Sequence, residues 1–319
     1  DSLEYGNFDF VIVDECHQAA ADDFAYKLAQ IQGQPRMIGL SATQDMRADK
    51  KDYRVEGAFG PIRMRMTYDE AREKGIVVPM EVKVRHVPPP EVDPAAGLKD
   101  EDMMRAAVWK YDPRNDLIVR DAVADVKAGY QVMIACTCLE HVLNVVRRFR
   151  RLKAKNPKLV GKLKLVPMYR EFANEAEYQK KLKDMSQPRK GVGEVLASLP
   201  RMTRELRLRQ TRKIESGEIR LFVCTTIFNV GFNPLHLDVV CRADAGGSEI
   251  GDHQLPGRAS RTNKAGKKVG TVREYDDAHN PTLHGRFDRR LKTYKKLKWK
   301  IIRLVKQPGR LGKKMSWED

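Results

Sequence analysis

Two adjacent carboxylates follow a short apolar run near the start of the chain. The run Phe10–Val13 is rich in β-branched residues, as is typical of a strand buried on both faces of a parallel sheet. Asp14 and Glu15 come directly after it, where the strand should end. Because ligands bind at the carboxyl ends of strands in open α/β sheets, one acid here can hold Mg²⁺ and its neighbour can accept a proton from an attacking water. The same acids also suit the first turn of a helix, and Ala19–Ala29 has a helical pattern, so this alternative stays open.

A pair of arginines near the other end of the chain could bind phosphate. Arg258 and Arg261 lie three residues apart in Gln254–Arg261, which we expect to open a helix, so both should project from one face. Guanidinium groups are always charged, planar and able to bind phosphate in a bidentate manner. Taken alone, such a pair is more often part of a surface ion-pair stripe.

Four segments of the chain, in this order, resemble motifs of the superfamily 2 helicases. They are D-E-C-H at Asp14–His17 (motif II, the Walker B box), G-L-S-A-T at Gly39–Thr43 (motif III), T-T-I-F-N-V-G-F-N at Thr225–Asn233 (motif V) and Q-L-P-G-R-A-S-R at Gln254–Arg261 (motif VI). The resemblance extends from about Asp1 to Asp276 and is greatest to DNA translocases of the phage and type III restriction kind.

This resemblance implies an ATP-dependent DNA helicase or translocase that uses ATP and Mg²⁺. Asp14 and Glu15 would form the metal site, with Asp14 holding Mg²⁺ and Glu15 orienting the attacking water. Arg258 and Arg261 would reach the γ-phosphate from the second domain. Cleft closure would be coupled to movement along the nucleic acid by His17, Ser41, Thr43 and Gln254.

Further residues are assigned to ligands by the same resemblance. Gly231 and Asn233 match the spacing T-x₅-G-x-D at the nucleotide, although Asn233 stands where Asp is usual and brings no charge. Thr225 and Thr137 would contact the nucleic-acid backbone, but Thr137 could equally be the N-cap of a helix over Leu139–Arg151. The basic helix end with Arg147 and Arg148 could contact phosphates or form a solvated helix face.

No G-x₄-G-K-[ST] phosphate-binding loop occurs in the chain. In the family this loop precedes motif II and cradles the β- and γ-phosphates. We therefore expect the chain to be the C-terminal part of a helicase whose first half-domain is an upstream segment or a separate polypeptide. The expected partner is DNA, single-stranded or branched duplex. One alternative is an RNA helicase, although the resemblance around Gly39–Pro79 favours DNA over RNA. Another is a module that binds nucleic acid without hydrolysis.

The expected fold is α/β, with two RecA-like parallel-sheet domains, the first incomplete at its N-terminus, and a basic C-terminal helical tail. We place the first domain at residues 1–85 and a Pro-rich linker at 86–100. The second domain would occupy residues 101–283, with a polar insertion at about 171–200. The tail would occupy residues 284–319, where aromatic residues are interleaved with basic ones.

Composition agrees with a polyanionic partner. The 319 residues include 60 Lys and Arg against 43 Asp and Glu, a net charge of +17. The five cysteines lack paired metal-binding spacing, so we expect reduced core residues. We find no apolar run near 18 residues and no signal peptide, so we expect no membrane association and a cytoplasmic location, in a bacterium or a phage-infected host.

Overall fold

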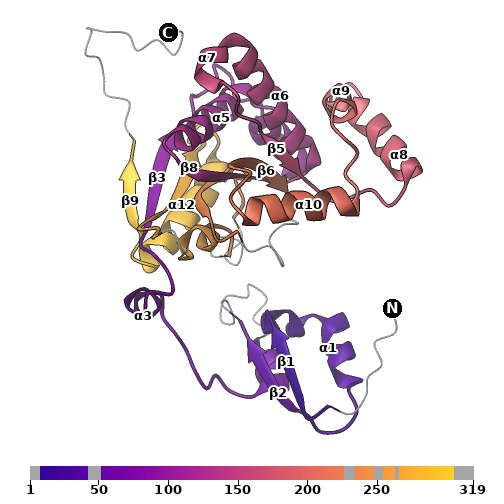
Figure 1. The fold of residues 1–319 in the computed structure, drawn as a ribbon, viewed down its shortest axis with the longest axis vertical. Coiled ribbons are helices and arrows are strands. Elements are labelled where there is room, and N and C mark those ends of the chain that lie inside the picture. Colours follow the sequence, from indigo (N-terminus) through magenta and orange to yellow (C-terminus); the bar gives the residue numbers. More distant parts are fainter. Residues whose placement is uncertain (1–7, 42–51, 226–233, 248–253, 263–265, 305–319) are drawn as a thin grey trace.

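The computed structural model describes residues 8–41, 52–225, 234–247, 254–262 and 266–304. The predicted site residues Thr43, Gly231 and Asn233 lie outside these residues. The described chain forms a small N-terminal body and a larger body, which are seen one below the other in Figure 1.

The small body is built on two parallel strands. β1 (Phe10–Asp14) pairs with β2 (Arg36–Leu40) in the register Val11 to Met37. The connecting chain forms the 3₁₀ helix η1 (Cys16–Ala20) and α1 (Asp22–Ala29), and α2 (Asp52–Phe59) follows β2. The apolar core lies on one face of the sheet only and includes Val13, Cys16 and Val55.

The larger body contains a seven-stranded sheet in the order β5-β6-β4-β7-β8-β3-β9, in which every observed pair is parallel. Its central strands are buried on both faces; all six residues of β4, for example, are buried. This pattern explains their near-continuous apolar sequences. The strands are β3 (Met80–His86), β4 (Gln131–Cys136), β5 (Val166–Met168), β6 (Leu221–Thr225), β7 (Leu237–Arg242), β8 (Gly270–Asp276) and β9 (Lys300–Arg303).

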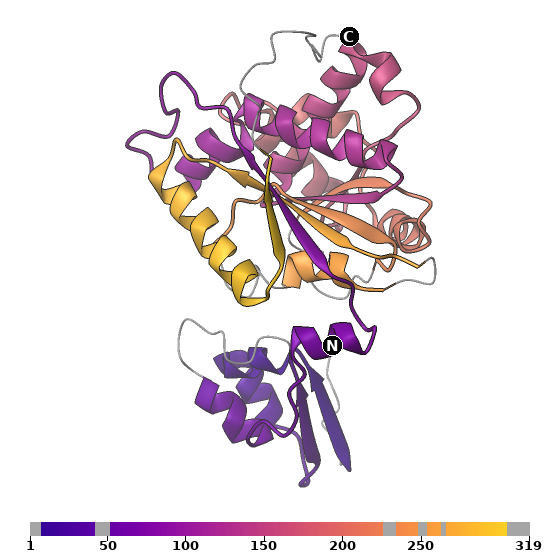
Figure 2. The same cartoon turned by 90° about the vertical axis from the view of Figure 1, so that its left-hand side faces the viewer.

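Helices cover both faces of this sheet, as Figure 2 shows in a view along its edge. The core on one face includes side chains of α5 (Asp112–Lys127) and α6 (Leu139–Lys155), and that on the other includes side chains of α10 (Arg204–Glu215) and α12 (Pro281–Lys296). The shorter helices are α3 (Tyr68–Glu73), α4 (Asp100–Met104), the π-helical turn Arg105–Trp109, α7 (Pro157–Val160), α8 (Glu175–Ser186) and α9 (Gly193–Ala197). The α/β fold with parallel sheets is thus as predicted.

The pairing of β3 corrects the expected domain boundary. We assigned residues up to 85 to the first domain, but β3 lies between β8 and β9 in the larger sheet. Helix α3 is attached to the same body, because Asp69 forms an ion pair of 2.6 Å with Lys298. The expected linker also contacts this body, where Asn280 Nδ2 donates to Asp93 Oδ2 at 3.1 Å. The chain therefore passes between the two bodies before α3, and we now place the boundary there.

The polar segment at 171–200 and the basic tail are both partly folded onto the larger body. The segment forms α8 and α9, whose Met185 and Leu196 are buried in the same core as α6. In the tail, α12 packs on the sheet and β9 forms its edge strand, and the rings of Tyr294 and Trp299 stack at 5.1 Å between centroids. Phe287, Tyr294 and Trp299 are buried, so packing and not base stacking explains their spacing.

A buried ion pair follows the end of β7. Arg242 Nε donates to Asp244 Oδ1 at 2.8 Å and Arg242 Nη2 to Oδ2 at 2.9 Å. Burial has the largest single effect and raises the pKa of Asp244. The Arg242 guanidinium, the charge of Arg290 and the Gly246 amide together outweigh burial and lower this pKa to about 2, below the ordinary value of 3.8. Because the pKa is depressed in the folded state, the carboxylate stabilises the fold above about pH 4 and loses that contribution as the pH falls towards 2.

We predict that acid lowers the free energy of unfolding by about 2 kcal/mol through Asp244 alone. Denaturant unfolding at pH 5 and at pH 2.5 measures the loss, and Asp244→Asn should remove this share of the pH dependence. An unchanged pH dependence in Asp244→Asn would show that the pair does not contribute.

Two further sequence predictions concern the cysteines and the membrane. In the described residues no cysteine forms a disulfide; four are buried and Cys138 is partly so. Nor does any helix within those ranges have the length and hydrophobicity needed to cross a membrane.

Candidate functional site

The two carboxylates lie at the end of β1, where they were expected. Asp14 is the last residue of the strand, and its Oδ1 accepts a hydrogen bond of 2.8 Å from the Glu15 amide. Glu15 precedes η1, but its side chain makes no capping hydrogen bond. Helix capping therefore does not explain this pair.

The backbone of Glu15 is in the left-handed region, with φ 53° and ψ 44°. For a residue with a side chain this conformation costs about 1–3 kcal/mol, and such residues cluster at functional sites. The turn directs the chain from β1 into η1, which carries His17.

The Glu15 carboxylate contacts one side chain of its own segment and one of the larger body. Its Oε2 lies 3.2 Å from His17 Nδ1 and accepts a hydrogen bond of 3.2 Å from Gln254 Nε2. The same His17 nitrogen lies 3.0 Å from Ser41 Oγ, directly after β2. Ser41 therefore contacts His17, and Gln254 contacts Glu15 from the larger body.

Close packing holds the D-E-C-H segment against β2. Cys16 is buried, and burial is the main cause that raises the pKa of its thiol. A Cβ atom on Gly39 would lie 2.9 Å from Cys16 Sγ and 2.9 Å from Phe59 Cγ, closer than such atoms normally approach. Only glycine at this position lets β2 approach η1 without displacement, and this approach sets Ser41 beside His17.

Arg258 is a buried cation on the segment that follows Gln254. It begins the 3₁₀ helix η4 (Arg258–Ser260) and is 5% exposed. Burial lowers the pKa of Arg258 to about 10; Cys224 and Glu15 oppose this effect and Arg261 adds to it. The group remains charged at neutral pH, and the charge of Glu15 acts on it across the two bodies. A buried cation of this kind favours an anion beside it.

The geometry of Arg261 corrects the expected shared helix face. The 3₁₀ helix ends at Ser260, and Arg261 has the extended values φ −66° and ψ 138°. Arg261 forms an antiparallel bridge with Val77, and the Val78 amide donates to Ser260 O at 2.7 Å. Ser260 and Arg261 are therefore held by the segment leading into β3, and Arg261 does not continue the helical turn that begins at Arg258. The charges of the two arginines still interact, since Arg261 lowers the pKa of Arg258.

The two threonines assigned to nucleic acid lie at the ends of neighbouring strands. Thr225 ends β6 and pairs in register with Cys136, the last residue of β4. Thr137 Oγ1 donates to Asp244 O at 3.1 Å, and the N-cap of α6 is Cys138. The alternative that Thr137 caps α6 is therefore wrong.

Arg148, for which phosphate contact and a solvated helix face were both open, is buried between two helices. It is 7% exposed, its Nε donates to Asp116 Oδ1 at 2.6 Å and its Nη1 to Asp112 Oδ2 at 2.5 Å. Arg147 donates to Asn144 Oδ1 at 2.7 Å and is only partly exposed. The guanidinium of Arg148 thus joins α6 to α5.

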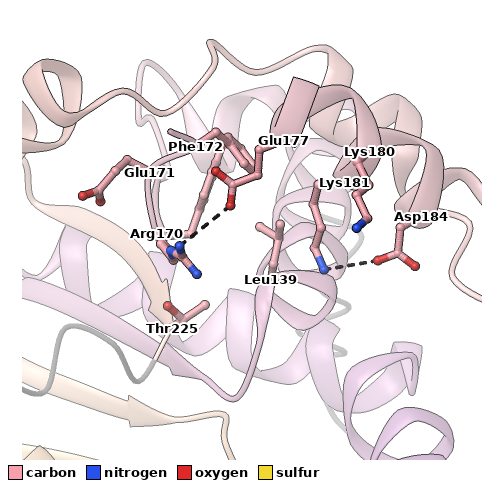
Figure 3. Close-up of a pocket in the computed structure, with 10 residues that line it drawn as sticks. Leu139, Arg170, Glu171, Phe172, Glu177, Lys180, Lys181, Asp184 and Thr225 are labelled. Atoms are coloured by element: carbon pink, nitrogen blue, oxygen red, sulfur yellow. Dashed lines mark hydrogen bonds and ion pairs between the residues drawn. The ribbon is translucent and has the colours of Figure 1, made fainter. Parts of the chain in front are cut away.

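Sequence reasoning missed a pocket at the carboxyl ends of β5 and β6. Its volume is about 480 Å³. Figure 3 shows Arg170 and Thr225 on one side of it and Lys180 and Lys181 of α8 on the other. The basic residues of the polar segment 171–200, to which we assigned no role, were the available signal.

The residues at the end of β1 fit a magnesium ion held mainly by a nucleotide. In the ranges that the structure describes, no three His, Cys, Asp or Glu side chains form a cluster able to hold a metal ion. Mg²⁺ bound with nucleotide phosphates needs only one or two protein carboxylates, with waters completing the shell. Asp14 is exposed and fits this requirement.

Comparisons with known proteins agree with the motif pattern. Residues 1–46 match the family model described as type III restriction enzyme, res subunit. No curated protein sequence gives a significant match to the chain.

Several solved structures share the fold. A fragment of a putative HsdR subunit of a type I restriction enzyme from Vibrio vulnificus YJ016 has a TM-score of 0.52 and 18% identity, over 87% of this chain and 46% of that one. The Mycobacterium smegmatis helicase Lhr, bound to single-stranded DNA and AMP-PNP, has a TM-score of 0.53 and 17% identity, over 92% of this chain and 32% of that one. Dbp5 of S. cerevisiae, bound to RNA and ADP BeF3, has a TM-score of 0.54 and 10% identity, over 92% of this chain and 59% of that one.

These likenesses establish the RecA-like α/β fold, and the family model adds a resemblance to type III restriction enzymes over residues 1–46. The chain spans 46%, 32% and 59% of the lengths of the three structures named above.

Proposed function

We propose that the chain is the C-terminal part of an ATP-dependent DNA helicase or translocase. The observation that carries the proposal is the contact of Glu15 with Gln254, which joins a carboxylate at the end of β1 to the arginine-bearing segment of the other body. A nucleotide held between the two bodies would link their closure to its own hydrolysis, as in hinge closure around a ligand.

Each residue of this site has a definite task in the proposal. Asp14 would hold Mg²⁺. ATP would supply the phosphoryl group, and Mg²⁺ much of the positive charge beside its phosphates. Glu15 would orient the attacking water and accept its proton. Arg258, with Arg261 nearby, would stabilise negative charge on the γ-phosphate oxygens.

The contacts of Glu15 suit a coupling device. Its Oε2 contacts both His17 and Gln254, and His17 contacts Ser41. A change in the position or protonation of the Glu15 carboxylate during hydrolysis would therefore alter contacts in both bodies. We propose that His17, Ser41 and Gln254 transmit it, together with Thr43, and that Gly231 and Asn233 contact the nucleotide.

An exposed apolar sheet face supports a missing half-domain. Parallel sheets are normally covered on both faces. In β1 and β2, however, the side chains on one face are 42–65% exposed; they are Phe10, Ile12, Ile38 and Leu40. We propose that a segment or polypeptide carrying further strands and the G-x₄-G-K-[ST] loop packs there, making this the second half of the first RecA-like domain.

The nucleic acid is the most readily tested part of the proposal. We expect the chain to bind single-stranded DNA with an affinity that falls steeply with salt, because its net charge is +17. The test is the affinity for DNA and RNA strands of the same sequence at several salt concentrations. Tighter binding of RNA would favour an RNA helicase, and no binding of either would contradict the proposal.

A second candidate function is a clamp that binds nucleic acid without hydrolysis. The lack of a phosphate-binding loop in the chain favours it. The contact between Glu15 and Gln254 speaks against it, since binding alone has no use for a carboxylate joining the two bodies.

A further inference from the structure

A cavity of about 440 Å³ lies at the edge of the larger sheet where its central strands begin. It is lined by residues at or just before the starts of β4, β6, β7 and β8, among them Gln131, Arg220, Asp238 and Lys267. Because these strands are parallel, this edge is opposite the one that carries Thr225. The volume falls within the range of about 300–1,000 Å³ that is typical of small-molecule pockets.

Hydrogen bonds fix the walls of this cavity. The backbone amide of Gln131 donates to Asp238 Oδ2 at 2.8 Å, which joins the starts of β4 and β7. The side-chain nitrogen of Gln131 donates to Ile214 O at 2.8 Å and to Ile219 O at 2.7 Å. The turn between these two carbonyls, which includes Gly217 of the cavity wall, is thereby held to β4. The cavity is therefore preorganised, and this reduces the cost of ordering a site around a ligand.

Positive charge predominates in the lining. Among the described residues that line the cavity, Asp238 is the only carboxylate, against the two cations Arg220 and Lys267. Arg220 is exposed and forms no ion pair with any residue in the described part of the chain. The ring of His236 lies against the turn at Gly217, where a Cβ atom would be 3.3 Å from His236 Cγ. Arg220 can therefore pair with an anion in the cavity, with a histidine ring in the same wall.

Lys267 brings a charge whose cost an anion would reduce. Its ammonium group donates to Leu237 O. Burial lowers the pKa of Lys267 to about 8, although the charge of Asp238 raises it. The group is still mostly protonated at neutral pH, but its surroundings disfavour the charged form. An anion beside the ammonium group would oppose this effect of burial.

We propose that this cavity binds the phosphate group of a small phosphorylated ligand, with Arg220 and Lys267 as the contacting cations. A guanidinium group binds phosphate in a bidentate manner and an ammonium group acts as a point charge. Tyr130, which is 45% exposed, lines the same cavity, and a nucleotide base could stack on its ring. The inference goes beyond the proposed function, because this edge of the sheet is opposite the threonines assigned to nucleic acid.

The test is isothermal titration calorimetry of the full chain with inorganic pyrophosphate and, separately, with AMP. Arg220→Ala should weaken binding of both ligands about tenfold, as for loss of a hydrogen bond to a charged group. Lys267→Gln keeps a donor for Leu237 O but removes the charge, and should weaken binding to a similar extent. Arg209→Ala is the matched control, since Arg209 is an exposed arginine of α10 outside the cavity and forms no ion pair with any described residue. It should change the affinity less than about twofold.

The two ligands distinguish the sources of the phosphate group. Tighter binding of AMP than of pyrophosphate, lost in Tyr130→Ala, would identify a nucleotide. Equal binding that is insensitive to Tyr130→Ala would identify a ligand held by its phosphate alone.

Three results would overturn the cavity as a binding site and leave the proposed function standing. They are no binding of either ligand by the wild-type chain, equal effects of Arg220→Ala and Arg209→Ala, and binding that is lost in Arg258→Ala but kept in Arg220→Ala. The last result would place the ligand at the proposed nucleotide site instead. Melting temperatures of the variants close to that of the wild-type chain would confirm that they fold.

Discussion

Replacing Arg258 with alanine should lower the rate of ATP hydrolysis by about 10³–10⁵ once the chain is combined with its phosphate-binding segment. The reason is that Arg258 is 5% exposed and its charge interacts with that of Glu15, which is the ground on which we assign it to the γ-phosphate. Because burial restricts water at this guanidinium, its charge acts in a low dielectric, where charge stabilisation is large. Steady-state hydrolysis should show the loss mainly in kcat.

Two variants make this result interpretable. Arg258→Lys keeps a positive charge but loses the bidentate geometry, so it should restore only part of the rate. Arg151→Ala removes an exposed arginine of α6 that forms no ion pair with any described residue, and should leave hydrolysis unchanged. A kcat within twofold of wild type in Arg258→Ala, with the fold intact by thermal melting, would remove Arg258 from the site.

Glu15→Gln should reduce hydrolysis in the combined enzyme by about 10²–10⁴ while nucleotide binding persists, because an amide cannot accept the proton of the attacking water. The substitution preserves size, and an amide can still meet His17 and Gln254 by hydrogen bonds. Single-turnover hydrolysis and binding of a nucleotide analogue separate these two effects.

The matched control is Glu56→Gln, an exposed glutamate on α2 of the same body, which should hydrolyse ATP at the wild-type rate. If Glu15→Gln hydrolysed ATP as fast as this control, Glu15 would not be the base, and its left-handed backbone and contacts would be purely structural.

The local elements could be predicted from the sequence because their signals are local. The largely apolar segment Arg36–Leu40 forms β2, and Tyr68–Glu73 forms a short helix. The positions of Asp14 and Glu15 at a strand end follow from the same kind of reasoning. The motif resemblance also grouped Ser41 with His17 in one coupling role, since it relates segments far apart in the chain, and the structure brings the two side chains together.

Long-range partners could not be read from such patterns. Alternation over Met80–His86 indicates a strand, but nothing local states that its neighbours are β8 and β9. Likewise, a basic helix end resembles a phosphate-binding surface until the acids of α5 are seen beside Arg148. The helix ending at Ser260, which separates Arg261 from Arg258, depends on the bridge to Val77 in another segment.

The most direct test of the central claim is ATP hydrolysis by the chain alone and by the chain with the segment encoded directly upstream, each with and without single-stranded DNA. We predict negligible hydrolysis by the chain alone, and DNA-stimulated hydrolysis when a strand and a G-x₄-G-K-[ST] loop are supplied. Robust DNA-stimulated hydrolysis by the chain alone, abolished by Glu15→Gln, would contradict the need for a missing half. Salt-sensitive DNA binding without hydrolysis even in the combined protein would contradict the enzyme and favour the clamp.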